Sequence, residues 1–355
     1  MAIRVAINGF GRIGRAVMRV AVPHPDIEVV AVNDLTDIEN LAYLLKYDSA
    51  YGHAPFAVGT KKIDWRTVLT VDGMDVPVFM EKDPAKLPWK DMNVDVVVEC
   101  TGVFTKYTAA KAHLDAGAKR VVISAPAKGE PSEAGVKGAT VLMGINDEAL
   151  QNAQITSNGS CTTNAAAPVI EILHEAMGVE KAMLNTIHAY TATQSIVDVP
   201  SKKDFRRGRA AAQNIIPSTT GAATAVTKVV TDLNGKFDGI AMRVPVVTGS
   251  VADVTFVSKR ATSVEEVNGI LRLAAEDERW KKVFAVSDEP LVSSDIVGSP
   301  HASIVDLAMT RVVDGNLVKV CAWYDNEMGY THALVEHVLR IGTLATQRQQ
   351  GSAAQ

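Results

Sequence analysis

The sequence predicts an α/β protein of two domains, in which a mostly parallel sheet interleaved with helices precedes an α+β domain with a largely antiparallel sheet. Three observations support this. Short apolar strands alternate with runs of helical periodicity over residues 4–156. Beyond a helix that begins near Cys161, the pattern changes to strands of alternating polarity joined by hairpins. The chain of 355 residues is also long enough for two cores.

Composition narrows the class of protein. The net charge of −4 gives no general reason to expect a nucleic acid or an anionic membrane as partner. The basic run 202–209 is short and carries one aromatic residue, which is typical of a solvated face. Three cysteines without a CxxC pair predict a reducing compartment, no disulfide scaffold and no metal site. Without an apolar run long enough to span a bilayer, and with a strand-like start in place of a signal peptide, we expect a cytoplasmic protein.

The first element is a short apolar strand over 4–7, followed by a glycine-rich turn and a helix over 15–21. The turn has the pattern GxGxxG, formed by Gly9, Gly11 and Gly14. A second strand over 27–32 ends in Asn33 and Asp34, so an acidic residue follows the last glycine by about 20 positions. This context predicts a Rossmann dinucleotide-binding domain. The glycines let backbone N–H groups approach a pyrophosphate, and Asp34 can accept hydrogen bonds from a ribose.

The remaining elements of the first domain continue the alternation. In order they are a helix near 38–46, a hairpin over 68–71 and 76–79, a strand over 94–99, a helix over 106–116, and strands over 120–124, 140–144 and 154–156. Ligands of such sheets bind at the carboxyl ends of the strands. Asp34, Thr101 and Ser124 all fall at such ends.

A lone cysteine stands where the chain leaves this sheet. The small polar segment 157–164 can cap the helical run that follows, which ends at Gly178. Cys161 is therefore expected on the first turn of a helix, where the dipole favours the nucleophilic thiolate. Position alone fits a buried structural cysteine equally well.

The second domain begins with a strand over 182–190 that carries His188, followed by a long polar segment over 191–221. Later elements are strands over 240–245 and 251–257, a helix over 264–276 capped at Thr262 or Ser263, a hairpin over 303–313 and 317–323, and a helix that begins after residues 324–327 and ends near Ile341. We expect domains at 1–158, completed by the helix 327–343, and at 159–326, with a flexible tail over 344–355.

Seven segments in register identify a family. They are AINGFGRIGR at 6–15, NDL at 33–35, SNGSCTTN at 157–164, HAYTATQ at 188–194, RRGRAAAQNIIPSTTGAA at 206–223, MRVP at 242–245 and WYDNEMGY at 323–330. In these segments the chain closely resembles the phosphorylating, NAD-dependent glyceraldehyde-3-phosphate dehydrogenases of glycolysis. The resemblance extends to about residue 343.

The resemblance implies an oxidoreductase with a covalent mechanism. Cys161 matches the nucleophile that attacks the aldehyde of glyceraldehyde 3-phosphate, and His188 matches its base. Hydride transfer to NAD leaves a thioester, which inorganic phosphate converts to 1,3-bisphosphoglycerate. The resemblance also implies a homotetramer.

The resemblance assigns the binding residues as well. For NAD they are Gly9, Gly11, Arg12, Ile13, Gly14, Asp34, Lys82, Thr101, Ser124 and Asn326. For the phosphate of the substrate they are Thr191, Thr193 and Arg243, and for inorganic phosphate Ser160, Thr162, Arg207, Thr220 and Gly221. Hydroxyls, backbone N–H groups and guanidinium forks suit these dianions.

The chain departs from the family pattern at several positions. These are Gly159, where Ala is usual, Ala165, where a second cysteine is common, Thr224 in place of Lys, and Met328 in place of Trp. Without a thiol at position 165, we expect no disulfide between Cys161 and that position. Asp34 and Pro200 fit NAD-preferring members rather than NADP-preferring ones.

Three other functions compete with this interpretation. Erythrose-4-phosphate dehydrogenase is a relative with the same nucleophile logic, but Thr220 and Gly221 favour the phosphorylating enzyme. A semialdehyde dehydrogenase is disfavoured by HAYT and WYDNE. A non-catalytic scaffold protein of the same fold is disfavoured by the presence of Cys161 and His188.

Overall fold

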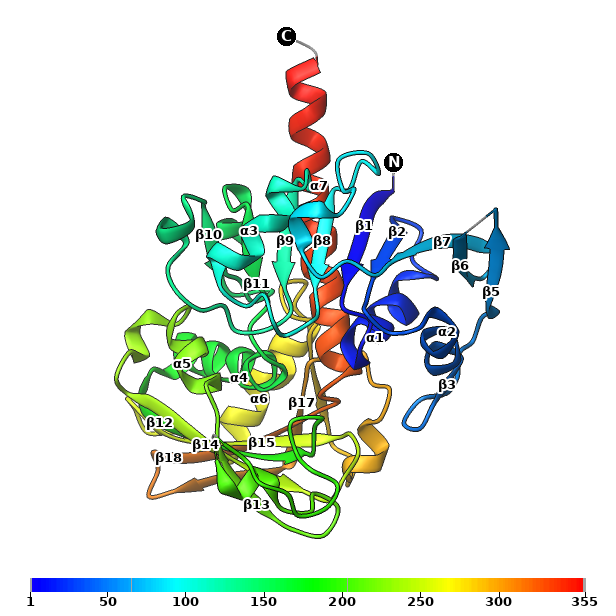
Figure 1. Cartoon of the computed structure of the whole chain (residues 1–355). Helices are drawn as coiled ribbons and strands as arrows, with labels where there is room; N and C mark the ends of the chain where they lie inside the picture. The colour runs from blue at the N-terminus through cyan, green and yellow to red at the C-terminus, as the bar shows by residue number, and fades with distance from the viewer. Residues whose placement is uncertain (1, 65, 203, 354–355) are drawn as a thin grey trace. The chain divides into compact units, whose positions relative to one another are not determined.

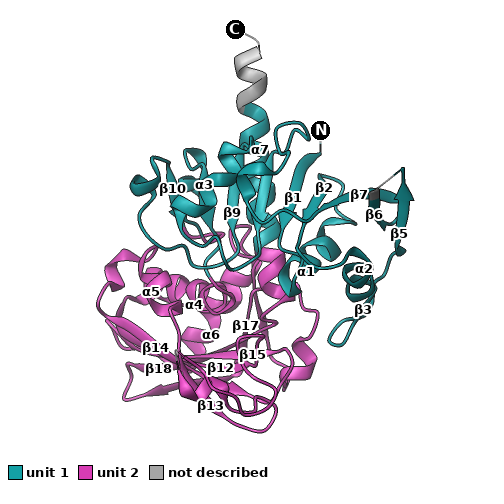
Figure 2. Cartoon of the chain, viewed as in Figure 1, with its two compact units in different colours: residues 1–141, 146–159, 334–355 teal, residues 142–145, 160–333 magenta. Residues whose placement is uncertain are grey.

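The structure is a computed structural model that describes residues 2–64, 66–202 and 204–353. Lys203 in the basic run and the last two residues of the expected tail lie outside the described residues. The chain forms two compact units (Figure 2). Unit 1 comprises the described residues up to Val141, residues 146–159 and the chain from Leu334 onward. Unit 2 comprises residues 142–145 and 160–333.

Unit 1 is built on a sheet whose strand order is β10-β11-β9-β8-β1-β2-β7-β6-β5 (Figure 1). In chain order the strands are β1 (Ile3–Asn8), β2 (Ile27–Asn33), β5 (Val58–Ile63), β6 (Arg66–Val71), β7 (Met74–Phe79), β8 (Val96–Glu99), β9 (Arg120–Ile123), β10 (Gly138–Thr140) and β11 (Ile155–Ser157). The pairs from β10 to β7 are parallel, while β6 runs antiparallel to β5 and β7. The helices are α1 (Arg12–Ala21), α2 (Ile38–Lys46), α3 (Tyr107–Asp115) and most of α7 (Met328–Ala353), and β3 (Tyr47–Asp48) pairs with β4 (Gly52–His53).

The glycine-rich turn joins β1 to α1 as the sequence predicts. Gly9 has a φ of +91°, a conformation that side-chain-bearing residues rarely adopt. A Cβ on Gly14 would lie 2.1 Å from the carbonyl oxygen of Gly9, so only glycine lets α1 start this close to the turn. The predicted parallel sheet and its glycine turn are confirmed.

The first helix begins at Arg12 rather than Arg15, and the strand expected over 94–99 begins at Val96. Two differences are larger. The strand expected over 140–144 is wrong, because β10 ends at Thr140 and residues 142–145 belong to unit 2. There Gly144 accepts a hydrogen bond from Arg279, so this apolar stretch is buried without pairing as a strand. The end of the last helix near Ile341 is also wrong. The helix continues to Ala353, since Leu344, Ala345 and the glutamines favour helix and Ala345 is still buried. Flexibility of residues 344–355 stays a prediction.

Unit 2 is built on a sheet with the order β13-β14-β12-β15-β18-β17-β16 (Figure 1). Its strands are β12 (Val179–Ala189), β13 (Ile216–Thr219), β14 (Phe237–Val244), β15 (Ser250–Ser258), β16 (Phe284–Ser287), β17 (Ser303–Val313) and β18 (Leu317–Tyr324). Only the β12–β14 and β16–β17 pairs are parallel. The predicted, largely antiparallel sheet is confirmed. The long polar segment 191–221 contains the strand β13.

The helices of unit 2 are α4 (Cys161–Met177), α5 (Ala222–Thr227) and α6 (Val264–Glu276). Helix α4 packs against α5 and α6 and contacts β12, β15, β17 and β18 of the sheet. The Ser160 side chain caps α4 by accepting a hydrogen bond from the N–H of Thr163 at 3.1 Å. Cys161 is the first residue of the helix, as predicted.

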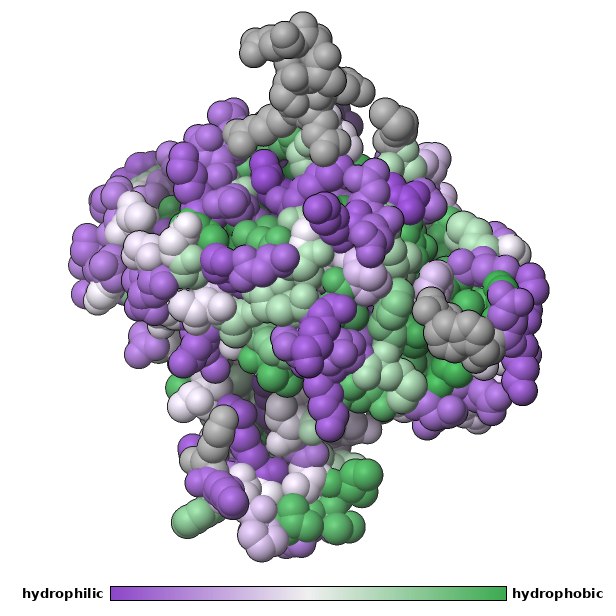
Figure 3. Space-filling view, turned by 45° about the horizontal axis from the view of Figure 1, so that its top comes forward, coloured by the Kyte–Doolittle hydropathy of each residue, from purple (hydrophilic) through white to green (hydrophobic). Residues whose placement is uncertain are grey.

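Among the described residues, no helix is long and apolar enough to cross a membrane. Figure 3 shows hydrophilic and hydrophobic residues interspersed over the visible face of the molecule.

Candidate active site

A pocket of about 380 Å³ lies at the carboxyl ends of the parallel strands in unit 1. The structure brings five of the predicted cofactor residues together in its lining: Gly9, Gly11, Asp34, Lys82 and Thr101. Asn8, Asn33, Cys100 and Phe104 also line it. A Cβ on Gly11 would meet no protein atom within 4 Å, so the start of α1 opens onto free space. The pocket therefore offers the backbone of the glycine turn to a ligand.

Asp34 ties this turn to the end of β2. Its Oδ2 accepts a hydrogen bond from the N–H of Phe10 at 2.7 Å, and its Oδ1 accepts one from the N–H of Thr36 at 2.9 Å. The carboxylate thus sits at the pocket wall with its position fixed by two backbone donors. It retains acceptor capacity for a ribose hydroxyl, since each carboxylate oxygen has two lone pairs.

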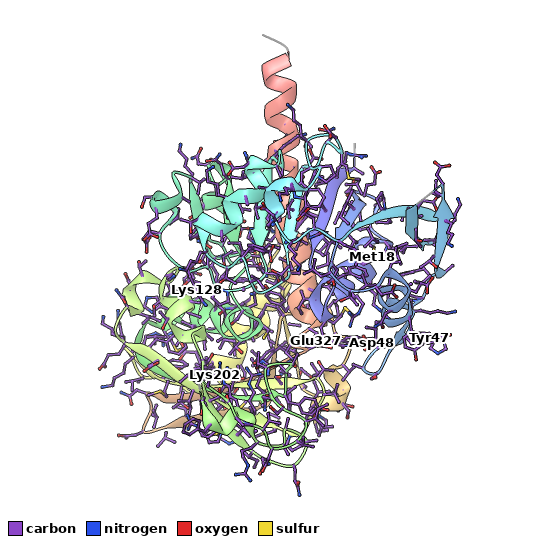
Figure 4. All side chains as sticks on the ribbon, viewed as in Figure 1. Met18, Tyr47, Asp48, Lys128, Lys202 and Glu327 are labelled. Atoms are coloured by element: carbon purple, nitrogen blue, oxygen red, sulfur yellow. The ribbon has the colours of Figure 1, made fainter. Side chains whose placement is uncertain are left out.

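The side chain of Arg12 turns away from the pocket toward β3. Its Nη1 and Nη2 donate to the two carboxylate oxygens of Asp48, at 2.6 and 3.2 Å. Figure 4 labels Asp48 beside Tyr47 on this strand. Burial disfavours the Asp48 carboxylate, but hydrogen bonds from Arg12 and from the N–H of Ala50 outweigh it and lower the pKa of Asp48. Arg12 can therefore serve a ligand through its backbone N–H rather than its guanidinium.

Three predicted residues lie outside the lining of this pocket. Ile13 and Gly14 are on the first turn of α1, outside the lining of the pocket. Ser124 follows β9, where its N–H donates to the carbonyl of Glu99 at 2.9 Å. Its side chain bonds the Cys100 thiol, whose pKa is nevertheless raised, mainly by burial.

In unit 2 the fold brings Cys161, His188 and Arg243 together. His188 on β12 and Arg243 on β14 are directly paired in register, so their side chains leave the same face of the sheet. The Cys161 Sγ lies 3.4 Å from Nε2 of His188. On the other side of the imidazole, Nδ1 lies 2.7 Å from the carbonyl oxygen of Ala189 and 2.6 Å from Nη1 of Arg243. Arg243 also donates to that carbonyl at 3.0 Å. The thiol, the imidazole and the guanidinium thus lie in a row in space, with the imidazole in the middle.

Burial dominates the electrostatics of this group. It raises the pKa of the Cys161 thiol, while the charge of Arg243 and the backbone N–H of Thr162 act in the opposite direction. Burial, followed by the charge of Arg243, lowers the pKa of His188 to about 3. The neutral thiol and the neutral imidazole are therefore favoured in this arrangement.

A buried tyrosine supports the thiol and the imidazole. The Tyr324 hydroxyl lies 2.9 Å from Oγ1 of Thr162 and 2.7 Å from Oγ1 of Thr186, and its ring meets His188 edge to face. Tyr324 thus joins the first turn of α4 to β12. Because the Thr162 hydroxyl is used in this bond and Thr162 is buried, its contribution to anion binding is limited to its backbone N–H.

The predicted anion-binding residues also belong to unit 2. The charge of Arg207, after burial, lowers the pKa of Arg243, so two guanidinium groups lie near each other. Arg207 donates through Nε and Nη2 to the hydroxyl of Ser218, at 3.1 and 2.7 Å. The hydroxyls of Thr191 and Thr193 are 2.8 Å apart. Proximity of like charges is typical of an anion site.

The other predicted anion ligands sit at helix starts. Ser160 caps α4, Gly221 is the N-cap residue of α5, and the Thr220 hydroxyl accepts a hydrogen bond from the N–H of Ala222 at 3.2 Å. Among the described residues, no group of three or more His, Cys, Asp or Glu side chains is arranged to hold a metal ion.

Asn326 is buried in unit 2 just before α7. Its Oδ1 accepts hydrogen bonds from the hydroxyl of Ser250 at 2.9 Å and from the N–H of Gly249 at 3.2 Å. These donors fix the orientation of the amide. Its Nδ2 finds no hydrogen-bond acceptor among the described residues, so it is the donor that a ligand can use.

Comparison with known families agrees with this geometry. Residues 3–107 match the model described as "Glyceraldehyde 3-phosphate dehydrogenase, NAD binding domain", and residues 160–326 match the one described as "Glyceraldehyde 3-phosphate dehydrogenase, C-terminal domain". The chain belongs to the glyceraldehyde-3-phosphate dehydrogenase family. The first match contains the pocket of unit 1 up to Phe104, and the second begins one residue before Cys161.

Curated glyceraldehyde-3-phosphate dehydrogenases are similar over nearly the whole chain. The enzyme of Geobacillus stearothermophilus is 50% identical over 95% of this chain and 97% of its own length. That of Thermotoga maritima is 50% identical over 94% of this chain and 97% of its own length. That of Mycobacterium avium is 48% identical over 96% of this chain and 99% of its own length. The resemblance found in the sequence is therefore confirmed, and with it NAD as the cofactor of this oxidoreductase family.

The sequence analysis missed two groups of side chains beneath these sites. One is Tyr324, and the other is a set of buried polar residues at the ends of three strands: Asn8, Asn33 and Glu99. The signal was available, because each of these polar residues directly follows an apolar run at the end of its strand, namely 5–7, 29–32 and 96–98. Buried polar groups in such positions need partners and are usually held for a reason.

Proposed function

We propose that this chain oxidises D-glyceraldehyde 3-phosphate with NAD and inorganic phosphate to give 1,3-bisphosphoglycerate, through a thioester on Cys161. The observation that carries the proposal is the 3.4 Å approach of the Cys161 Sγ to Nε2 of His188, with Arg243 beside the imidazole. A thiol within reach of a base suits attack on an aldehyde carbon. The guanidinium suits a substrate with a phosphate group.

The first step uses the Cys161–His188 pair. Nη1 of Arg243 can only donate and lies 2.6 Å from Nδ1 of His188, so the guanidinium has to move from Nδ1 to the phosphate of the substrate before Nδ1–H can donate to the carbonyl of Ala189. Nε2 of His188 then takes the thiol proton. The thiolate then attacks the aldehyde carbon, and a C–S bond forms. The carbonyl electron pair moves to oxygen, which takes the proton back from the imidazolium and gives a hemithioacetal.

Oxidation and phosphorolysis follow at the same sulfur. Neutral His188 accepts the hydroxyl proton of the hemithioacetal as its C–H bond breaks, which leaves a thioester on Cys161. NAD supplies the hydride acceptor for this step. An oxygen of inorganic phosphate attacks the thioester carbon, the C–S bond breaks, and the acyl phosphate leaves Cys161 as a thiolate.

Two anions are bound by unit 2 in this scheme. Arg243 with Thr191 and Thr193 holds the phosphate of the substrate. Ser160, the N–H of Thr162, Arg207, Thr220 and Gly221 hold inorganic phosphate. A dianion next to Arg243 offsets the charge that disfavours the imidazolium of His188, so substrate binding raises the pKa of His188 and makes it a better acceptor for the thiol proton.

The pocket of unit 1 fits the dinucleotide. The open start of α1 at Gly11, with the backbone N–H groups of Arg12 and Ile13, receives the pyrophosphate. Asp34 receives the adenosine ribose, and Lys82, Thr101 and Ser124 lie around the cofactor. Gly9 and Gly14 shape the turn. Asn326 orients the carboxamide of the nicotinamide through its free Nδ2. We assign NAD binding to residues 1–158 with 327–343, and substrate binding to 159–326.

We further propose a cytoplasmic homotetramer. Large apolar side chains are exposed on β12, β14 and β18 of the unit 2 sheet, among them Met183, Ile240 and Leu317, and a second copy of the chain would cover such residues. The three cysteines are free thiols, which fits a reducing compartment. Light scattering coupled to gel filtration tests the assembly, and a monomeric mass contradicts it.

The test of the reaction is formation of NADH from glyceraldehyde 3-phosphate and NAD, with and without inorganic phosphate, beside erythrose 4-phosphate. We expect phosphate-dependent turnover of the triose and none with Cys161→Ser. Turnover that favours the tetrose without need of phosphate would assign the chain to erythrose-4-phosphate dehydrogenase. Absence of turnover on both substrates would favour the interpretation as a non-catalytic scaffold protein.

A further inference from the structure

A row of buried polar side chains crosses the sheet of unit 1 directly beneath the pocket. Asn33, Asn8 and Glu99 are paired in register at the last positions of β2, β1 and β8. All three are at most 5% exposed. Asn33 Nδ2 donates to Asn8 Oδ1 at 2.7 Å, and Asn8 Nδ2 donates to Glu99 Oε2 at 2.5 Å. The next residues along the three strands are Gly9, Asp34 and Cys100, and all three line the pocket.

The carboxylate of Glu99 is surrounded by donors. Oε2 accepts from Asn8 Nδ2 and lies 3.1 Å from Nε2 of His113 on α3. Oε1 accepts from the N–H of Thr101 at 2.8 Å and from the Thr101 hydroxyl. Four donors thus face a group that only accepts when it is ionised.

The tautomer of His113 follows from its second partner. Trp89 Nε1 lies 3.0 Å from Nδ1 of His113, and an indole N–H can only donate. Nδ1 is therefore an acceptor, and Nε2 carries the proton that points at Glu99. Trp89 and His113 are fully buried, so no water competes for these positions.

Hydrogen bonds connect both ends of the row to segments that line the pocket. At one end, Asn33 Oδ1 accepts from the N–H of Glu81 at 2.9 Å, and Asn33 Nδ2 donates to the carbonyl of Glu81 at 3.0 Å. Glu81 precedes Lys82, and both line the pocket. At the other end, Glu99 holds the backbone and the side chain of Thr101. The row therefore sets the separation of the segments around the ligand.

We propose that Glu99 is a positioning residue for NAD binding, whose carboxylate accepts from these four donors, fixes the hydrogen-bond polarity of Asn8, Asn33 and Thr101 and thereby holds the pocket rim open for the cofactor. The proposal rests on the placement of NAD in this pocket, which is part of the function proposed above. Glu99 itself does not line the pocket, so it acts through its neighbours.

An amide at position 99 cannot replace the carboxylate, although it has the same shape. If its NH₂ takes the place of Oε1, it faces the backbone N–H of Thr101, which cannot reverse. If it takes the place of Oε2, it faces Asn8 Nδ2 and the proton of His113. Reversal of Asn8 then turns its Nδ2 toward Asn33 Nδ2, and reversal of Asn33 in turn breaks its two hydrogen bonds to the backbone of Glu81. Each arrangement leaves a buried donor without an acceptor.

The experiment compares Glu99→Gln with a matched control in the same unit. The control is Thr156→Val, which removes the buried hydrogen bond between Oγ1 of Thr156 and Nε2 of His337 at 2.8 Å, outside the pocket. Calorimetric titration with NAD gives the Kd of each protein, urea unfolding gives its stability, and initial rates give the KM for NAD and for the aldehyde.

We expect Glu99→Gln to raise the Kd and the KM for NAD about tenfold or more, with the KM for the aldehyde within about twofold of the parent. Thr156→Val should lose stability and keep the parent Kd. A Glu99→Gln protein that binds NAD like the parent overturns the proposal, and so does an equal loss of affinity in Thr156→Val. If Glu99→Gln fails to fold, Trp89→Phe is measured in its place. It removes the indole N–H that holds the proton of His113 on Nε2, and the Kd for NAD should then rise about threefold. An unchanged Kd overturns the proposal. Failure of the parent chain to bind NAD would instead refute the proposed function.

Discussion

Replacing each of two glycines of the same turn by alanine should change the free energy of unfolding by very different amounts. A Cβ on Gly14 would lie 2.1 Å from the Gly9 carbonyl oxygen and 3.2 Å from a side-chain carbon of Ile7. No rotamer change relieves a contact with backbone, so α1 must shift by about 1 Å, at a cost of about 3 kcal/mol. Gly11 has φ −70° and ψ −158°, which alanine adopts readily, and its Cβ would meet no protein atom. The free energy of unfolding of Gly11→Ala should stay within about 1 kcal/mol of the parent.

Gly11→Ala, which should keep its stability, is nevertheless expected to lose affinity for the cofactor. The free space at Gly11 is where the pyrophosphate is proposed to approach the backbone, and a methyl group there blocks it. We expect the Kd of Gly11→Ala for NAD to rise about a hundredfold, which is about 2.7 kcal/mol. Gly14→Ala should lose both stability and affinity.

Thermal unfolding and calorimetric titration with NAD separate the two effects. The combination that refutes the reasoning is a stable Gly11→Ala protein with the parent affinity, because the pyrophosphate then cannot lie against this turn. A Gly14→Ala protein of unchanged stability would refute the packing argument.

Four further outcomes are expected. His188→Asn should lower kcat by a factor of about 10²–10⁴ and slow alkylation of Cys161 by iodoacetamide at neutral pH, and parent rates would exclude His188 as the base. Arg243→Met removes a charge that lowers the pKa of Cys161, so alkylation measured against pH should shift to higher pH, and a shift to lower pH contradicts this. Tyr324→Phe leaves two threonine hydroxyls without their partner and should cost about 1–3 kcal/mol in urea unfolding, whereas an unchanged midpoint would show that the bridge is dispensable. Burial lowers the pKa of His337 to about 3, below its unfolded value of about 6.5. The stability it contributes is thus complete above pH 6.5 and falls as the pH drops, by about 2 kcal/mol at pH 5. His337→Gln should flatten this slope, and an equally steep slope assigns it to other groups.

Most of the helices and strands could be predicted from local sequence patterns. The first-turn position of Cys161 could be predicted because a capping serine precedes it and apolar residues repeat at helical spacing after it. The glycine turn and Asp34 were predictable because their spacing reflects one βαβ unit. The helix over 38–46 and the hairpin over 303–313 and 317–323 matched for the same reason, since both are defined by neighbours in the sequence.

What local patterns could not supply was long-range pairing. Nothing between residues 188 and 243 indicates that His188 and Arg243 stand in register on parallel strands, and this pairing is what creates the site. The apolar stretch 140–144 was mistaken for a strand because burial in unit 2 gives the same apolar pattern. The hydrogen bonds of Glu99 were out of reach for a similar reason, since Asn8 is 91 residues away.

The most direct test of the central claim is mass spectrometry of the peptide that contains Cys161, after the enzyme is mixed with NAD and glyceraldehyde 3-phosphate without inorganic phosphate. We predict a 3-phosphoglyceryl adduct on Cys161, and its discharge as 1,3-bisphosphoglycerate when phosphate is added. No adduct on Cys161, or loss of the adduct at the same rate with and without phosphate, would contradict the thioester mechanism and the second anion site.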